Sequence, residues 1–113
     1  MLPRLTTYEE FWPFYVSQHR HTLNRGLHFV GTTLVILCLV ATVLVSPLWL
    51  LAAPLAGYGF AWAGHFFVEK NRPATFSYPL WSLRGDFRMY RLILFRKMGP
   101  EIERAARLHP QAA

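Results

Sequence analysis

The sequence of 113 residues has little of what many enzyme classes require. It contains one cysteine, Cys38, so an internal disulfide and a Cys-x-x-Cys motif are both excluded. It has no Gly-rich phosphate-binding loop and no Gly-x-Ser-x-Gly elbow. Its five histidines are roughly half the number that a membrane di-iron desaturase or hydroxylase needs. For a catalytic metal, a mononuclear site is therefore the better hypothesis.

Charge is also missing from the middle of the chain. Between Gly26 and Val68, 43 residues pass without an Asp, Glu, Lys or Arg, and Ser46-Pro47 interrupts them near the centre. A transmembrane helix needs about 20 apolar residues. This stretch therefore predicts two such helices, residues 23–45 and 48–69, joined by a tight turn. In a soluble protein, the other residues would have to cover this hairpin and shield it from water. Those residues are themselves rich in aromatic side chains and are poorly suited to this role.

The charged residues lie on both sides of this apolar stretch. Twelve Lys and Arg against six Asp and Glu give a net charge of +6, and no cation lies at the central turn. The positive-inside rule then predicts a multi-pass protein with both termini in the cytoplasm. We expect the bacterial inner membrane, or the endoplasmic reticulum if the source is eukaryotic. The partners expected for the cations are anionic lipid headgroups and not nucleic acid.

Each flank also carries a helical pattern. Thr7 followed by Glu10 has the spacing of a capping box, and it opens an aromatic segment, residues 7–18, which is typical of a helix at the membrane interface. Residues 80–97 combine an apolar stripe (Leu80, Leu83, Phe87, Tyr90 and Leu94) with a basic one (Arg84, Arg88 and Arg91). This pattern predicts a second interfacial helix. The expected fold is thus a single all-α membrane domain, residues 1–113, in which interfacial amphipathic helices flank a transmembrane helical hairpin.

The histidines gather at the two boundaries between polar and apolar sequence. Four of the five lie there, and His109 lies in the tail; the four are His19, His21, His28 and His65. Asn24 and His28 are four residues apart and share a helix face, as do His65 and Glu69. Packing the two faces together would gather imidazoles, a carboxamide and a carboxylate. Such nitrogen and oxygen donors suit iron, zinc or copper.

Two segments carry a family resemblance. Residues 18–28 (QHRHTLNRGLH) and 64–74 (GHFFVEKNRPA) resemble the membrane 2-hydroxy fatty acid dioxygenase family, whose yeast member acts in converting phytosphingosine to odd-numbered fatty acids. In organisation the likeness covers residues 8–95. The resemblance implies an iron(II)-dependent enzyme that uses O₂ to shorten a 2-hydroxy fatty acid by one carbon.

The same resemblance implies roles for particular residues. His19, His28 and His65 match the family's histidine positions best and are the implied metal ligands and catalytic residues, with His21 or Glu69 as a further candidate ligand. The residues implied to support the ligands or to bind the substrate carboxylate are Asn24, Arg25, Glu69, Lys70 and Arg72.

Two other functions fit the same residues. A small membrane adaptor or assembly protein would use the histidines only to line a polar interface, and it would bind no stoichiometric metal. A b-type haem carrier would use His28 and His65 as axial ligands and would show a Soret band. A homo-oligomer would close the exposed face of the hairpin, although no pattern in the chain demands one.

Overall fold

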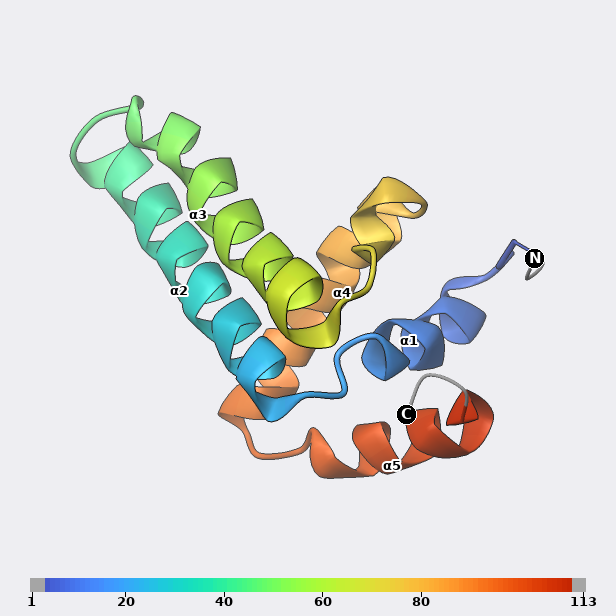
Figure 1. The fold of residues 1–113 in the computed structure, drawn as a ribbon. Coiled ribbons are helices and arrows are strands. Elements are labelled where there is room, and N and C mark those ends of the chain that lie inside the picture. Colours follow the sequence, from blue (N-terminus) through green and yellow to red (C-terminus); the bar gives the residue numbers. More distant parts are fainter. Residues whose placement is uncertain (1–3, 111–113) are drawn as a thin grey trace. The chain divides into compact units, whose positions relative to one another are not determined.

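A computed structural model describes residues 4–110 of the chain, and every regular element in that range is helical. The chain divides into two compact units. The central unit comprises residues 21–73, and the described part of the terminal unit comprises residues 4–20 and 74–110. The elements in order are α1 (Tyr8–Ser17), α2 (Thr22–Leu44), α3 (Trp49–Ala63), the π-helix η1 (Gly64–Glu69), the 3₁₀-helix η2 (Ala74–Phe76), α4 (Pro79–Leu94) and α5 (Gly99–Leu108) (Figure 1). The expected all-helical class is confirmed.

The central unit consists mainly of α2 and α3, which lie side by side and run antiparallel (Figure 1). The expected turn joins them: the backbone N–H groups of Leu48 and Trp49 donate to the hydroxyl and the carbonyl of Ser46, at 3.3 and 3.1 Å. Gly57 faces Val35, and a Cβ added at Gly57 would lie only 2.9 Å from a Val35 methyl carbon. This small residue therefore lets the two backbones approach closely.

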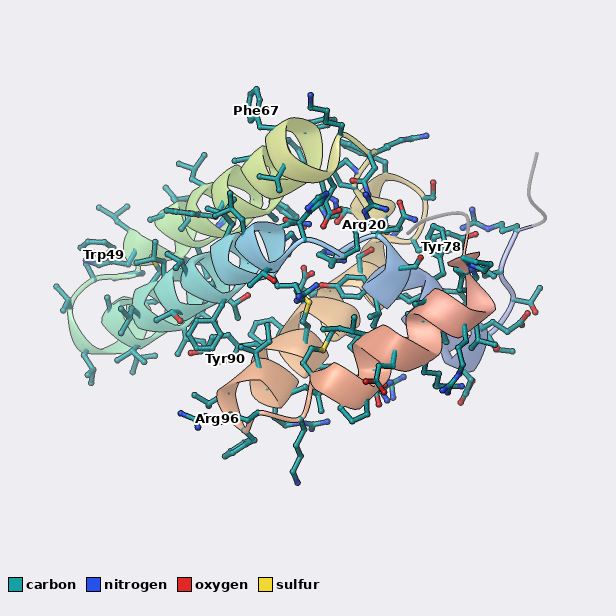
Figure 2. The ribbon with its side chains drawn as sticks, turned by 60° about the horizontal axis from the view of Figure 1, so that its bottom comes forward. Arg20, Trp49, Phe67, Tyr78, Tyr90 and Arg96 are labelled. Atoms are coloured by element: carbon teal, nitrogen blue, oxygen red, sulfur yellow. The ribbon has the colours of Figure 1, made fainter. Side chains whose placement is uncertain are left out.

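Among the described helices, α2 is long and apolar enough to cross a membrane. It has 23 residues and contains an 18-residue window of mean hydropathy 2.3. α3 has 15 residues, but η1 follows it directly, so the backbone stays helical up to Glu69. Apolar side chains such as Trp49 and Phe67 point outward, with 46% and 79% of their surface exposed (Figure 2). A membrane-spanning α2 fits these features, whereas the transmembrane hairpin and the multi-pass topology stay predictions.

In the terminal unit, α1 packs against α4 and α5. Thr7 caps α1 as expected, because its hydroxyl accepts the Glu10 N–H at 3.2 Å. The rings of Phe11, Trp12 and Tyr15 are at most 2% exposed. The sequence suggests an aromatic belt at the membrane interface. These rings instead form a core, because neighbouring helices of the same unit cover them.

α4 packs through a face that its hydrophobic pattern does not reveal. Its buried residues are Ser82, Gly85 and Met89. Gly85 provides the contact with α1, because a Cβ there would lie 3.2 Å from ring carbons of Tyr15. Most of the predicted apolar stripe remains largely exposed, including Leu80 at 79%. α4 thus keeps an amphipathic outer surface, since small side chains and one methionine supply its packing.

Candidate metal centre

The antiparallel packing of the central unit brings His28 and His65 together. His28 lies on α2 and is 5% exposed, and His65 lies on η1 and is 2% exposed. Their ring centroids are 5.0 Å apart, and the rings are nearly perpendicular at 89°. The two histidines that the sequence places at opposite ends of the apolar stretch are therefore in edge-to-face contact.

Each of these rings has an oxygen acceptor at Nδ1. Nδ1 of His28 lies 3.1 Å from the carbonyl of Asn24, one helical turn earlier. Nδ1 of His65 lies 2.7 Å from Oδ1 of Asn71. Because oxygen acceptors require an N–H at Nδ1, the lone pair of each neutral imidazole is at Nε2. Histidines that bind metals usually have this arrangement, in which the second nitrogen donates to an oxygen.

The backbone around Asn71 explains how it reaches His65. η1 is a π-helix, a form that often occurs at functional sites, and Lys70 after it has φ of 58°. This left-handed residue reverses the chain, so that the N–H of Asn71 donates to the carbonyl of His65 at 2.9 Å. Asn71 therefore holds both the backbone and the ring of His65. Sequence reasoning missed this role, although Asn71 lies inside the second resemblance segment.

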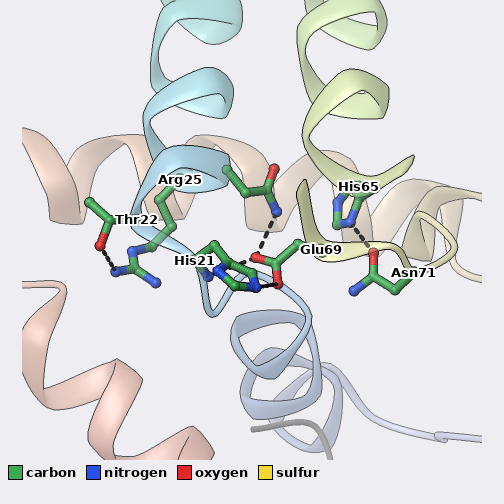
Figure 3. Close-up of polar contacts among 7 residues, drawn as sticks. His21, Thr22, Arg25, His65, Glu69 and Asn71 are labelled. Atoms are coloured by element: carbon green, nitrogen blue, oxygen red, sulfur yellow. Dashed lines mark hydrogen bonds and ion pairs between the residues drawn. The ribbon is translucent and has the colours of Figure 1, made fainter. Parts of the chain in front are cut away.

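Glu69 lies at the N-terminus of α2 (Figure 3). One carboxylate oxygen accepts the backbone N–H of His21 at 2.8 Å and the side-chain amide of Asn24 at 3.1 Å. Its second oxygen lies 3.8 Å from Nε2 of His21. The side chain of Glu69 is 2% exposed and that of His21 is 44% exposed. Glu69 thus accepts a backbone N–H at the start of α2 and holds the side-chain amide of Asn24. This contact is the pairing of carboxylate and carboxamide that the shared helix faces predict.

The amide oxygen of Asn24 lies in the interior of the central unit. Asn24 is completely buried, and its Oδ1 has no hydrogen-bond partner among the described residues. This oxygen lies against Gly64, so a Cβ added at Gly64 would collide with it. Because an unpaired buried acceptor is costly, this oxygen is suited to accept a hydrogen bond from a bound molecule.

In the terminal unit, His19 lies two residues after the end of α1 and is completely buried. Its Nδ1 lies 2.7 Å from the carbonyl of Tyr15, and the two rings are 4.2 Å apart between centroids. The hydroxyl of Tyr15 donates to Asp86 of α4 at 2.5 Å. Burial raises the pKa of Asp86 to about 7. His19 therefore shares the Nδ1 arrangement of His28 and His65, and it is held by residues that the sequence alone does not single out.

Each of the three histidines has the donor chemistry of a metal ligand. His19, His28 and His65 are all buried, and each offers one ring nitrogen. Three neutral imidazoles suit iron(II), zinc or copper.

The other predicted residues lie outside this set. Arg25 donates to the Thr22 hydroxyl at 3.1 Å. Lys70 and Arg72 are exposed, and Lys70 forms the left-handed turn. His109 ends α5, where its ring meets Phe14 edge-on at 6.1 Å between centroids. His109 thus belongs to the packing of the terminal unit, in agreement with its exclusion from the histidine cluster.

Comparison with known proteins agrees with the motifs. The family model described as "2-hydroxy-palmitic acid dioxygenase Mpo1-like" matches residues 5–98, which is most of the chain and includes both resemblance segments. No match to a curated protein or to a solved structure was found. Because this match covers most of its length, the chain belongs to the 2-hydroxy-palmitic acid dioxygenase Mpo1-like family.

Proposed function

We propose that the protein is an iron(II)-dependent membrane dioxygenase that shortens 2-hydroxy fatty acids by one carbon, with His19, His28 and His65 as the metal ligands. One observation carries this proposal: each of these buried histidines has an oxygen acceptor at Nδ1, at 2.7, 3.1 and 2.7 Å respectively. In this tautomer the lone pair is at Nε2, the nitrogen through which such a histidine would bind a metal. The family name supports the substrate and the reaction.

The number of ligands agrees with this substrate. A bound iron(II) would supply the redox chemistry with O₂ and coordination positions for the carboxylate and hydroxyl of a 2-hydroxy acid. The three histidines would hold the ion and would leave its remaining positions for the carboxylate, the hydroxyl and O₂. The overall reaction balances when a 2-hydroxy acid and O₂ give the acid one carbon shorter, CO₂ and water.

Residues around the histidines would bind and orient the substrate. The buried oxygen of Asn24 can accept the hydrogen of the substrate hydroxyl. Glu69 holds the amide of Asn24 through its nitrogen, so the oxygen keeps a fixed direction. Arg25, Lys70 and Arg72 are the candidates to neutralise the substrate carboxylate, because they lie in the two motifs.

The geometry disfavours the haem carrier. Two axial imidazoles must lie on opposite faces of a porphyrin. The rings of His28 and His65 are in edge-to-face contact at 5.0 Å between centroids, which is closer than two imidazoles on opposite faces of a porphyrin would lie.

We also propose the membrane topology expected from the sequence. In that topology α2 and the continuous helix of residues 49–69 form a transmembrane hairpin, with both termini in the cytoplasm. The apolar composition of α2 and the exposed apolar side chains of α3 support it. A hairpin would place His28 and His65 at similar depth near one face of the bilayer.

Metal content tests the proposed function. The full chain would be purified in detergent without a chelator or a nickel column, then reconstituted with iron(II) and measured by mass spectrometry. We expect about one iron per chain in the wild type and in His109→Ala, which serves as the matched control. We expect losses of tenfold or more in His28→Ala, His65→Ala and His19→Ala, because changing even a group that hydrogen-bonds to a ligand typically costs about 10–100-fold in metal affinity. O₂ uptake with 2-hydroxypalmitate should follow the iron content.

Other outcomes would contradict the proposal in different ways. Full iron and turnover in His28→Ala or His65→Ala would remove these residues from the site. A reconstituted wild type that binds no metal would favour the adaptor. A Soret band would favour the haem carrier.

A further inference from the structure

The terminal unit has a row of arginines on the outer surface of α4. Arg84, Arg88 and Arg91 follow one another at helical spacing, and Arg104 of α5 lies on the same hollow as the first two. Among the described residues, no carboxylate forms an ion pair with any of these four side chains. The row therefore carries positive charge that the fold itself does not neutralise.

Two of these guanidinium groups rest on aromatic rings of α1. The guanidinium carbon of Arg84 is 3.9 Å from the ring centre of Tyr8, and that of Arg88 is 4.2 Å from the ring of Trp12. Trp12 is fixed in turn, because its indole N–H donates to Glu101. Each cation–π contact holds a guanidinium carbon over a ring, and a guanidinium has five N–H donors that can bind an anion.

Two surface hollows adjoin these groups, and Arg84 and Arg88 line both. One, of about 190 Å³, is lined by Tyr8, Glu9, Trp12, Arg84, Arg88 and Arg104. The other, of about 440 Å³, is lined by Arg84, Phe87, Arg88 and Arg91. Glu9 lines the smaller hollow, where three arginines outnumber it, and no acidic residue lines the larger hollow. Guanidinium groups around such a space favour a phosphate, which they bind through paired N–H donors.

We propose that these hollows bind the phosphate of an anionic phospholipid headgroup. The neighbouring surface indicates a lipid, because Leu80, Leu83 and Phe87 are 79%, 49% and 40% exposed on the same helix. These apolar side chains can enter the acyl region while the arginines hold the headgroup. The site differs from general attraction between a basic helix and a membrane, because aromatic rings fix two of its donors. It does not depend on the proposed iron chemistry.

Binding of a short-chain lipid tests the site in the full chain. The protein, in a neutral maltoside detergent, would be titrated with dihexanoyl phosphatidylglycerol, with the matched diacylglycerol that lacks phosphate, and with inorganic phosphate. We expect saturable binding of the phospholipid and none of the diacylglycerol. Arg84→Gln with Arg88→Gln should weaken phospholipid binding by at least about tenfold. The control pair Lys97→Gln and Arg107→Gln removes the same charge outside the hollows and should weaken it by less than about twofold.

A charge-preserving variant separates the built site from bulk attraction. Arg84→Lys with Arg88→Lys keeps both charges but loses the planar guanidinium and its paired N–H donors, so binding should still weaken by at least about threefold. Wild-type affinity in the lysine variant, or equal losses in the two glutamine pairs, would overturn the proposal in favour of unspecific attraction. Inorganic phosphate that binds as tightly as the phospholipid would overturn the assignment to a lipid.

Discussion

Gly64 provides a sharp test of how closely η1 approaches α2. A Cβ added at Gly64 would collide with the side-chain oxygen of Asn24. Asn24 is completely buried, and its amide nitrogen donates to Glu69 at 3.1 Å. In Gly64→Ala the Asn24 side chain has to move, and this movement breaks its bond to the carboxylate. The substitution therefore disturbs the interior through one methyl group.

The expected loss can be estimated from these contacts. Overpacking of a well-packed interior costs about 1–3 kcal/mol. A hydrogen bond to a charged group contributes about 1.5–3 kcal/mol, and the helical preference of Ala over Gly returns up to about 1 kcal/mol. We therefore expect Gly64→Ala to lower the free energy of unfolding by between about 2 and 5 kcal/mol.

Gly59→Ala is the matched control, because Gly59 is in α3 and a Cβ added there would point into open space. It should raise stability by about 0.5–1 kcal/mol through helix propensity alone. Both variants would be unfolded in detergent and followed by circular dichroism. Equal stability of Gly64→Ala and Gly59→Ala would refute the close contact between η1 and Asn24.

Two further predictions follow from the hydrogen bonds around the histidines. Asn71→Leu should weaken metal binding about 10–100-fold, because His65 loses the hydrogen-bond partner of its Nδ1. Asn71→Asp keeps an oxygen acceptor and should retain metal binding. A competition titration with zinc measures both affinities, and unchanged affinity in Asn71→Leu would contradict the role assigned to Asn71. Burial raises the pKa of Asp86 from 3.8 to about 7, so the folded state favours the protonated carboxyl. The resulting contribution to the free energy of unfolding is fully present below pH 4 and is lost as the pH rises to about 7. The loss of stability should reach roughly 4 kcal/mol at most, since each pKa unit corresponds to about 1.4 kcal/mol. Stability measured from pH 4 to 8 should show this loss in the wild type and not in Asp86→Asn. Equal pH profiles of the two proteins would contradict this reasoning.

Some elements could be predicted closely because their signal is local. The helix expected at residues 23–45 is α2, Thr22–Leu44, since a long run of apolar side chains permits few other structures. The cap at Thr7 depends on residues within one turn. The pairing of Asn24 with Glu69 and the contact of His28 with His65 also follow from helix spacing, once two helices are known to pack antiparallel.

Other features of the candidate site could not be predicted. η1 is a π-helix, in which each backbone hydrogen bond spans one residue more than in an α-helix. The hydrophobic pattern of this apolar segment does not reveal that difference. Asn71 reaches His65 only because Lys70 adopts a left-handed conformation. Tyr15 supports His19 through a backbone carbonyl, a group that every residue has.

The sequence by itself determined the helical class, the extent of α2, the histidines at the polar boundaries and the family. These depend on composition and on spacing along one chain. Tertiary structure alone decided that the rings of α1 form a core, that α4 packs through Gly85, and that oxygen acceptors fix Nδ1 of the buried histidines. The physical reason is that burial and hydrogen-bond direction depend on which groups meet across elements, and residues distant in sequence supply those groups.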